Sequence, residues 1–145
     1  MVFVLQAPEL YRFTGGSPPD GRELRKRYAR QVKGRSRDGH EVWRNWVVRR
    51  RADGVAVGWI QATLTGSGMQ STAELAWTIG ADYQRRGYAR EAAATAMSAL
   101  RAEGATRFIA HVHPEHAASI AVARSLGLLC TDRVHEGEVL WRTPD

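Results

Sequence analysis

At 145 residues, with 43% hydrophobic and 25% charged side chains, the chain has the composition of one folded domain with a core of its own. No apolar run reaches the roughly 18 residues of a membrane span, and the N-terminus lacks the features of a signal peptide. The net charge of +6 is concentrated in residues 1–72, and the single cysteine, Cys130, excludes an internal disulfide. We therefore expect a cytoplasmic protein without a membrane partner.

Hydrophobic periodicity and turn residues predict an alternation of helices and strands within this one domain. Helical segments are expected at residues 8–13, 21–34, 90–103 and 117–126. Strands are expected at residues 41–49, 55–64, 72–79, 107–113, 131–134 and 138–142. No internal repeat or low-complexity segment interrupts this order.

Two local sequence signals indicate where elements of secondary structure begin and end in the N-terminal half of the chain. Asp20 can cap the helix at 21–34, and the pair Asp53-Gly54 predicts the turn of a hairpin. Met1–Gln6 is either a cut-down first strand or no strand, so the front of the domain is expected to be short. The basic residues of this half favour either a solvated face or the attraction of an anionic ligand.

The segment Gln84–Ala89 joins the strand at 72–79 to the alanine-rich helix that follows. A glycine-bearing turn that opens a helix aims several unpaired N–H groups at one point, and the helix dipole adds partial positive charge there. Arg85 and Arg86 would add full charges at the rim. The segment has neither the G-x-x-x-x-G-K-[ST] nor the G-x-G-x-x-G pattern, so it is neither a P-loop nor a dinucleotide fingerprint. It predicts a site for a phosphate or diphosphate.

The pattern Gln84-x-x-Gly87-x-Ala89 resembles the acetyl-CoA pyrophosphate loop, [Gln/Arg]-x-x-Gly-x-[Gly/Ala], of the Gcn5-related N-acetyltransferase (GNAT) family. Residues 75–83 resemble the family's fourth strand and the connection to this loop. Residues 113–128 resemble its second motif. Within the family, the chain most resembles the ribosomal-protein-alanine acetyltransferase-like branch.

This resemblance implies both a fold and a reaction. The fold is an α/β (α+β) domain whose mixed, mainly antiparallel sheet is splayed between the strands at 72–79 and 107–113, with helices on both faces. The reaction is direct transfer of an acetyl group from acetyl-CoA to a primary amine, on a protein N-terminus or a small molecule, in a ternary complex. Cys130 is expected in the core, so no acyl-enzyme is expected.

The resemblance also implies site residues. Cofactor contacts are implied for Trp77, Thr78, Ile79, Gln84, Arg85, Arg86, Gly87, Tyr88, Ala89, Arg90, His116 and Ser119. His116 stands where the family usually has asparagine, and Ala123 stands where many relatives have a tyrosine acid. Glu74, the only carboxylate of its strand, is the implied general base, and Ser119 is the implied acid.

Other interpretations of the sequence stay open. His111, His113 and His116 lie close together and suggest a metal site, although the resemblance implies none. A non-catalytic acyl-CoA sensor would keep the loop without the reaction. A basic nucleic-acid-binding module is a weaker option, because alternate residues around Arg44 point to opposite faces of a strand. A homodimer is one option for the oligomeric state, and the sequence does not name the acceptor amine.

Overall fold

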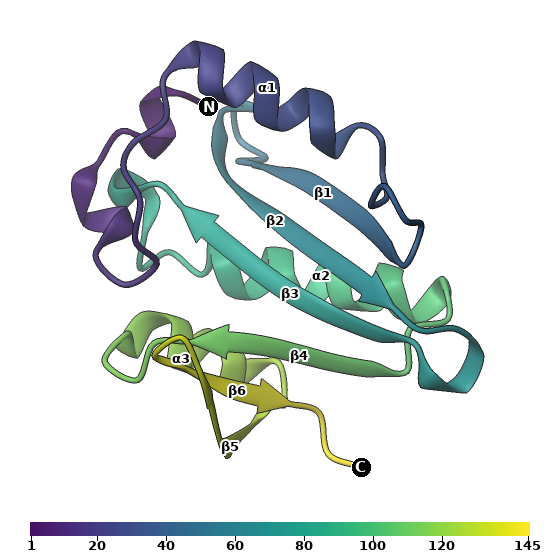
Figure 1. Ribbon diagram of the computed structural model, residues 1–145. Coiled ribbons are helices and arrows are strands. Elements are labelled where there is room, and N and C mark those ends of the chain that lie inside the picture. The colour runs from purple at the N-terminus through teal and green to yellow at the C-terminus, as the bar shows by residue number, and fades with distance from the viewer.

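A single mixed sheet of six strands organises the computed structural model, which describes all 145 residues (Figure 1). The strands are β1 (Glu41–Arg49), β2 (Ala56–Thr65), β3 (Thr72–Ile79), β4 (Arg107–Val112), β5 (Leu129–His135) and β6 (Glu138–Arg142). The helices are α1 (Gly21–Gln31), α2 (Tyr88–Ala102) and α3 (Ala117–Ser125), and short 3-10 turns lie at Phe3–Leu5, Pro8–Tyr11, Gly68–Gln70 and Ala81–Tyr83. The strands lie in the order β1-β2-β3-β4-β6-β5. All neighbours are antiparallel except β3 and β4, which are parallel.

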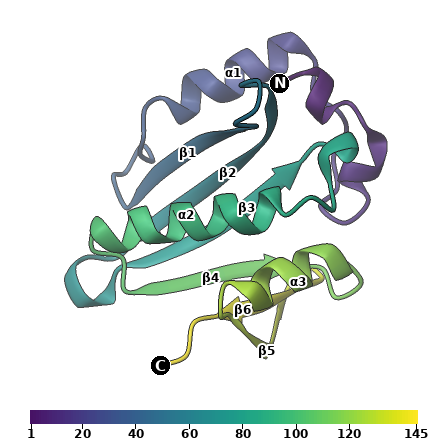
Figure 2. The same cartoon turned by 180° about the vertical axis from the view of Figure 1, so that it is seen from behind.

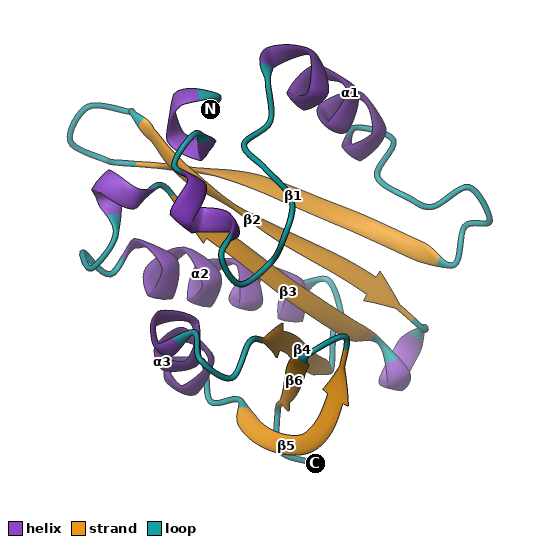
Figure 3. Ribbon diagram, turned by 60° about the vertical axis from the view of Figure 1, so that its left-hand side comes forward, coloured by secondary structure: helices purple, strands orange, loops and turns teal.

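Helices cover both faces of this sheet. Figure 2 shows α2 and α3 on one face, and Figure 3 shows α1 and the N-terminal turns on the other. Under the first pair, Phe108 of β4 belongs to one buried cluster with Met97 and Leu100 of α2 and Ala123 of α3. On the opposite face Leu24 of α1 is buried. The predicted α/β domain, with a mixed, mainly antiparallel sheet between helices, is confirmed.

The first residues form 3-10 turns in place of a strand. In Phe3–Leu5, the Leu5 N–H donates to carbonyls earlier in the same turn, so it is not available to a strand ladder. Leu5 is buried beside β2, and its carbonyl accepts a hydrogen bond from the Tyr11 hydroxyl at 3.0 Å. The option of a cut-down strand at Met1–Gln6 is therefore wrong, and β1 is the outer strand of the sheet.

Helix α1 begins at its predicted cap. Oδ1 of Asp20 accepts the Glu23 N–H at 2.8 Å, and Oε2 of Glu23 accepts the Asp20 N–H at 2.9 Å, which makes a capping box. Replacing Asp20 with alanine removes the side-chain acceptor and should lower the free energy of unfolding by about 1 kcal/mol. Urea unfolding measures this, with Asp20→Asn as the control because asparagine also caps well. Equal stability of the two variants would contradict the role of the cap.

Burial in α2 is regular, whereas at Cys130 it departs from the prediction. The inner face of α2 carries Ala93, Ala96, Met97 and Leu100. Cys130, expected in the core, is exposed in β5. That expectation is wrong because β5 is an outer strand of the sheet, and most of its side chains face solvent. None of the helices combines the length and the apolar character that crossing a membrane requires.

Strands β3 and β4 pair over only a short stretch. Their register joins Thr72–Glu74 to Arg107–Ile109, and residues 75–79 of β3 have no partner in β4. The two strands diverge beyond this point, and we call this divergence the fork. It confirms the predicted splay of the sheet, and it places the end of β3, the start of α2 and the start of α3 around one region (Figure 1).

Candidate active site

The loop between β3 and α2 has the form of an anion site. Arg85 and Gly87 have positive φ angles of 60° and 81°, and Gly87 caps α2 without a side-chain hydrogen bond. The main-chain N–H groups of residues 85–90 donate to no acceptor in the protein. A Cβ built on Gly87 would meet no atom within 4 Å, so these groups border open space. Such a turn offers several donors and the positive end of the helix dipole to a phosphate.

Gln84 ties this anion loop to the strand that precedes it. Its Nε2 donates to the Ile79 carbonyl at 3.0 Å, so the side-chain amide is engaged within the protein. Arg85, Arg86 and Arg90 are exposed around the loop. The loop thus has one side chain that is hydrogen-bonded to β3 and three exposed arginines in or next to it.

The main chain of β3 directs polar groups toward the fork. The Thr78 carbonyl lies against β2, since a Cβ built on Gly58 would be 2.1 Å from its oxygen. Main-chain groups of successive residues in a strand point to opposite edges, so those of Trp77 and Ile79 point toward the fork. The Ile79 carbonyl already accepts a hydrogen bond from Gln84. The N–H and C=O of Trp77 and the N–H of Ile79 therefore point toward the fork without a partner in β4. Thr78, also expected to contact the cofactor, directs its main chain to β2.

Glu74 and His111 form a polar pair at the base of the fork. Glu74 is the last residue of β3 paired with β4, and its Oε1 lies 2.7 Å from Nδ1 of His111. Both side chains lie on the face away from α2, because their neighbours Leu75 and Ala110 are buried under the helices. In the sequence, His111 stood out only as a candidate metal ligand. The pairing depends on the register of β3 and β4, for which the sequence holds no direct signal.

On the helix side of the fork, the Trp77 indole reaches α3. Its Nε1 donates to Oγ of Ser119 at 3.3 Å, and that oxygen lies 3.5 Å from Nε2 of His116. Burial lowers the pKa of His116, and the nearby His113 lowers it further. His116 is therefore neutral near pH 7 and has one N–H to donate. The structure brings three of the expected site residues, from β3 and α3, into one cluster.

The N-terminal segment adds a contact that no sequence pattern indicates. The Phe13 ring stacks on His116 with 4.6 Å between centroids, and it lies 5.0 Å from the ring of His113. The third histidine of the candidate metal site, His111, pairs with Glu74 instead. No group of three or more His, Cys, Asp or Glu side chains is arranged to hold a metal ion.

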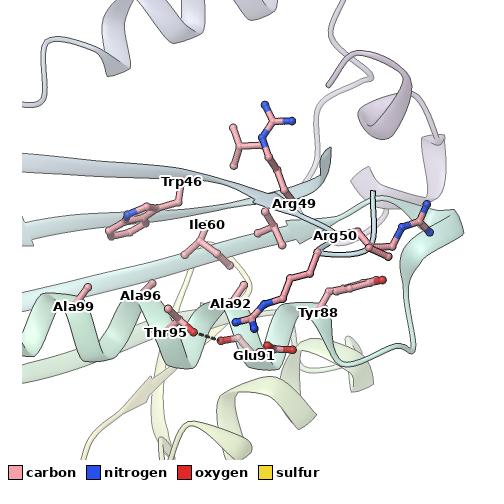
Figure 4. A pocket seen from close by; sticks show the side chains of 14 residues that line it. Trp46, Arg49, Arg50, Ile60, Tyr88, Glu91, Ala92, Thr95, Ala96 and Ala99 are labelled. Atoms are coloured by element: carbon pink, nitrogen blue, oxygen red, sulfur yellow. Dashed lines mark hydrogen bonds between the residues drawn. The ribbon is translucent and has the colours of Figure 1, made fainter. Parts of the chain in front are cut away.

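A groove of about 570 Å³ lies between α2 and the strands β1 and β2 (Figure 4). Trp46 and Ile60 of the sheet face small side chains of α2 across it. Arg50 lies at one end with its guanidinium 5.6 Å from the centre of the Tyr83 ring and paired with Asp53. The lining is mostly apolar and contains neither member of the polar pair, so the groove is not assigned to the chemistry.

A split sheet with an anion loop beside the split is the arrangement that the resemblance to the GNAT acetyltransferases leads us to expect. Residues 1–129 match the family described as Acetyltransferase (GNAT) domain. This match spans most of the chain, which belongs to the GNAT family and is therefore an N-acetyltransferase that uses acetyl-CoA. No curated protein matches the sequence significantly.

Solved structures show the same fold at low sequence identity. The spermidine N-acetyltransferase of Vibrio cholerae, solved with CoA and spermine, has a TM-score of 0.71 and 16% identity, covering 97% of this chain and 84% of that one. The aminoglycoside acetyltransferase AAC(6')-Ib, solved with coenzyme A, has a TM-score of 0.75 and 11% identity, covering 98% and 86%. A candidate ribosomal-protein-serine acetyltransferase from Vibrio cholerae has a TM-score of 0.61 and 21% identity, covering 82% and 70%. The names of these proteins point to three different acceptors.

Proposed function

We propose that the chain transfers the acetyl group of acetyl-CoA directly to a primary amine, which binds on the face of the sheet that carries Glu74 and His111. The observation that carries the proposal is the fork, with the anion loop near its open end and the polar pair at its base. The loop would hold the diphosphate. The main-chain groups of Trp77 and Ile79 would hold the amides of the pantetheine arm as an added strand would. A main-chain N–H of β3 would polarise the thioester carbonyl.

Direct transfer fits the chain better than an acyl-enzyme does. A covalent step needs a nucleophile beside the thioester, with a base to activate it. Cys130 is the only thiol, and it lies in β5, which β4 and β6 separate from the fork. The hydroxyl of Ser119 does lie at the fork, and we assign it to the leaving sulfur.

Ser119 is proposed to donate a hydrogen bond to the leaving thiolate. Its Oγ accepts from Trp77 and lies 3.5 Å from Nε2 of His116, and a His116 ring with its hydrogen on Nε2 leaves the hydroxyl hydrogen to donate to the sulfur. Replacing Ser119 with alanine should lower kcat about ten-fold, the worth of one hydrogen bond to a charged group. The rate of thiol release measures this, with Ser125→Ala near the other end of α3 as the matched control. An unchanged kcat would leave Ser119 with a packing role only.

The proposed acceptor is a protein N-terminus, as in the ribosomal-protein-alanine acetyltransferase-like branch. The support is the second motif, in which Ser119 follows His116 by one helical turn, together with a solved structure described as a candidate ribosomal-protein-serine acetyltransferase. Polyamines and aminoglycosides are the competing acceptors, because two other similar structures are named for them.

The test measures free thiol released from acetyl-CoA in the presence of single amines. The panel contains peptides with a free N-terminal alanine or serine, the same peptides with an acetylated N-terminus, spermidine and one aminoglycoside. We expect the free peptides to react fastest and the blocked peptides not to react. Faster reaction with spermidine or the aminoglycoside would show that a protein N-terminus is not the preferred acceptor. If acetyl-CoA binds in calorimetry but no amine causes release of thiol, the proposed acetyl transfer would be wrong and a non-catalytic sensor would be favoured.

A further inference from the structure

We propose that His111 is the catalytic base of this site and that Glu74 positions it. The inference rests on the proposed function and replaces the role of general base that the sequence resemblance implied for Glu74, because its carboxylate then acts through the imidazole. It makes His111 the group that contacts the acceptor amine. The observation behind it is a hydrogen bond between side chains of two strands that separate immediately beyond it.

The His111 ring has one nitrogen engaged and one free. Its Nδ1 lies 2.7 Å from Oε1 of Glu74, and no protein group bonds Nε2. The side chain is 24% exposed, so it is held by its surroundings and still open to a ligand. Its partner across the ladder on β6 is the apolar Leu140, which offers no competing side-chain hydrogen bond. A fixed imidazole therefore presents a free nitrogen at the base of the fork.

Glu74 decides which ring nitrogen carries the hydrogen. A carboxylate accepts hydrogen bonds, so Nδ1 donates to Glu74 and Nε2 keeps its lone pair. The lone pair on Nε2 is then the basic site that this ring offers to a ligand. The nearby titratable rings are His135 of β5, with 6.2 Å between centroids, and His113, which follows β4. Neither is a carboxylate, so Glu74 is the hydrogen-bond acceptor of the His111 ring.

The proton movements balance under this assignment. An acceptor ammonium gives one proton to Nε2 of His111, and the neutral nitrogen then forms the C–N bond to the thioester carbonyl carbon. The C–S bond breaks with its electron pair on sulfur, and a second amine proton moves to that sulfur. The products are the N-acetyl amide, the free thiol and a protonated His111, which returns its proton to water.

A double-mutant cycle separates this role from that of a purely structural pair. His111→Asn keeps a donor near the position of Nδ1 and removes Nε2, and Glu74→Gln removes the charge. We expect kcat to fall about 100-fold in each single variant and no further in the double variant, because residues that act as a unit are not additive. His135→Gln, which alters the exposed neighbouring ring, is the matched control and should keep kcat within about two-fold.

Each outcome of the cycle has a defined meaning. Wild-type kcat in His111→Asn would overturn the proposal. Losses that multiply to about 10⁴ in the double variant would show that Glu74 acts independently of His111. Calorimetry with acetyl-CoA accompanies every variant, and equal affinities exclude misfolding as the cause of a lower rate. A wild-type protein that binds acetyl-CoA but acetylates no amine would remove the proposed function, and the base role with it.

Nitrogen NMR of His111 gives a second readout that does not depend on turnover. With the ring neutral, the wild-type nitrogen shifts should place the hydrogen on Nδ1, the reverse of the form that free histidine favours. In Glu74→Gln this preference should be lost or reduced, since an amide can donate to Nδ1 as well as accept from it. A wild-type ring with its hydrogen on Nε2 would overturn the proposal whatever the kinetics show.

Discussion

Replacing Glu74 with glutamine is expected to lower kcat about 100-fold and to leave the affinity for acetyl-CoA within about two-fold of wild type. Glutamine keeps the size of the side chain and an oxygen that can accept from His111. It removes the negative charge, and its amide can also donate to Nδ1, so the His111 ring is no longer held in one tautomer. The anion loop lies at the other end of the fork, so cofactor binding should not change.

Initial rates of thiol release at saturating acetyl-CoA, together with calorimetry, measure this result. Glu41→Gln is a matched control, because Glu41 also lies in a strand and also accepts a side-chain hydrogen bond, here from Trp43. It lies in the outer strand β1, so its replacement should not affect turnover. Equal rates in Glu74→Gln and wild type would remove Glu74 from the mechanism.

A valine at Gly87 is expected to weaken acetyl-CoA binding about 100-fold, equivalent to losing one or two hydrogen bonds to charged oxygens. The new side chain would enter the open space that the loop borders, between the unpaired N–H groups and any bound phosphate. It would also strain the backbone, because φ is 81° at this position. Calorimetric titration with acetyl-CoA measures the change.

Gly137→Val separates strain from obstruction. Gly137 has a φ of 82°, and a Cβ built there also meets no atom within 4 Å, but it lies in the turn between β5 and β6. Both variants should lose about 1–2 kcal/mol of stability, and only Gly87→Val should lose affinity. A Gly87→Val protein that binds acetyl-CoA as tightly as the Gly137→Val protein would show that the loop does not hold the cofactor.

The elements of the fold were predictable because their signals are local. The strand expected at 72–79 matches β3 at both ends, since its alternation of apolar and polar residues stops at Gly80. The hairpin turn at Asp53-Gly54 and the cap at Asp20 are likewise set by neighbours in sequence. The anion loop belongs to the same class of feature, because the chemistry of one short segment defines it.

Contacts between distant segments were not predictable in this way. Glu74 and His111 are 37 residues apart, and Trp77 and Ser119 are 42 apart. Their meeting depends on strand register and side-chain rotamers, which only the packed core determines. The exposure of Cys130 has the same origin, because it depends on the outer position of β5 in the sheet, which pairing between distant strands determines.

The brief pairing of β3 with β4 has a consequence for the stability of the whole molecule. Only three ladder pairs join the two halves of the sheet, so much of the remaining cohesion comes from packing under α2 and α3 and from side-chain contacts such as that of Glu74 with His111. A ligand that contacts both halves of the sheet would stabilise their association, and its binding would raise the free energy of unfolding. Acetyl-CoA bound as proposed would therefore make the folded state more stable as its concentration rises.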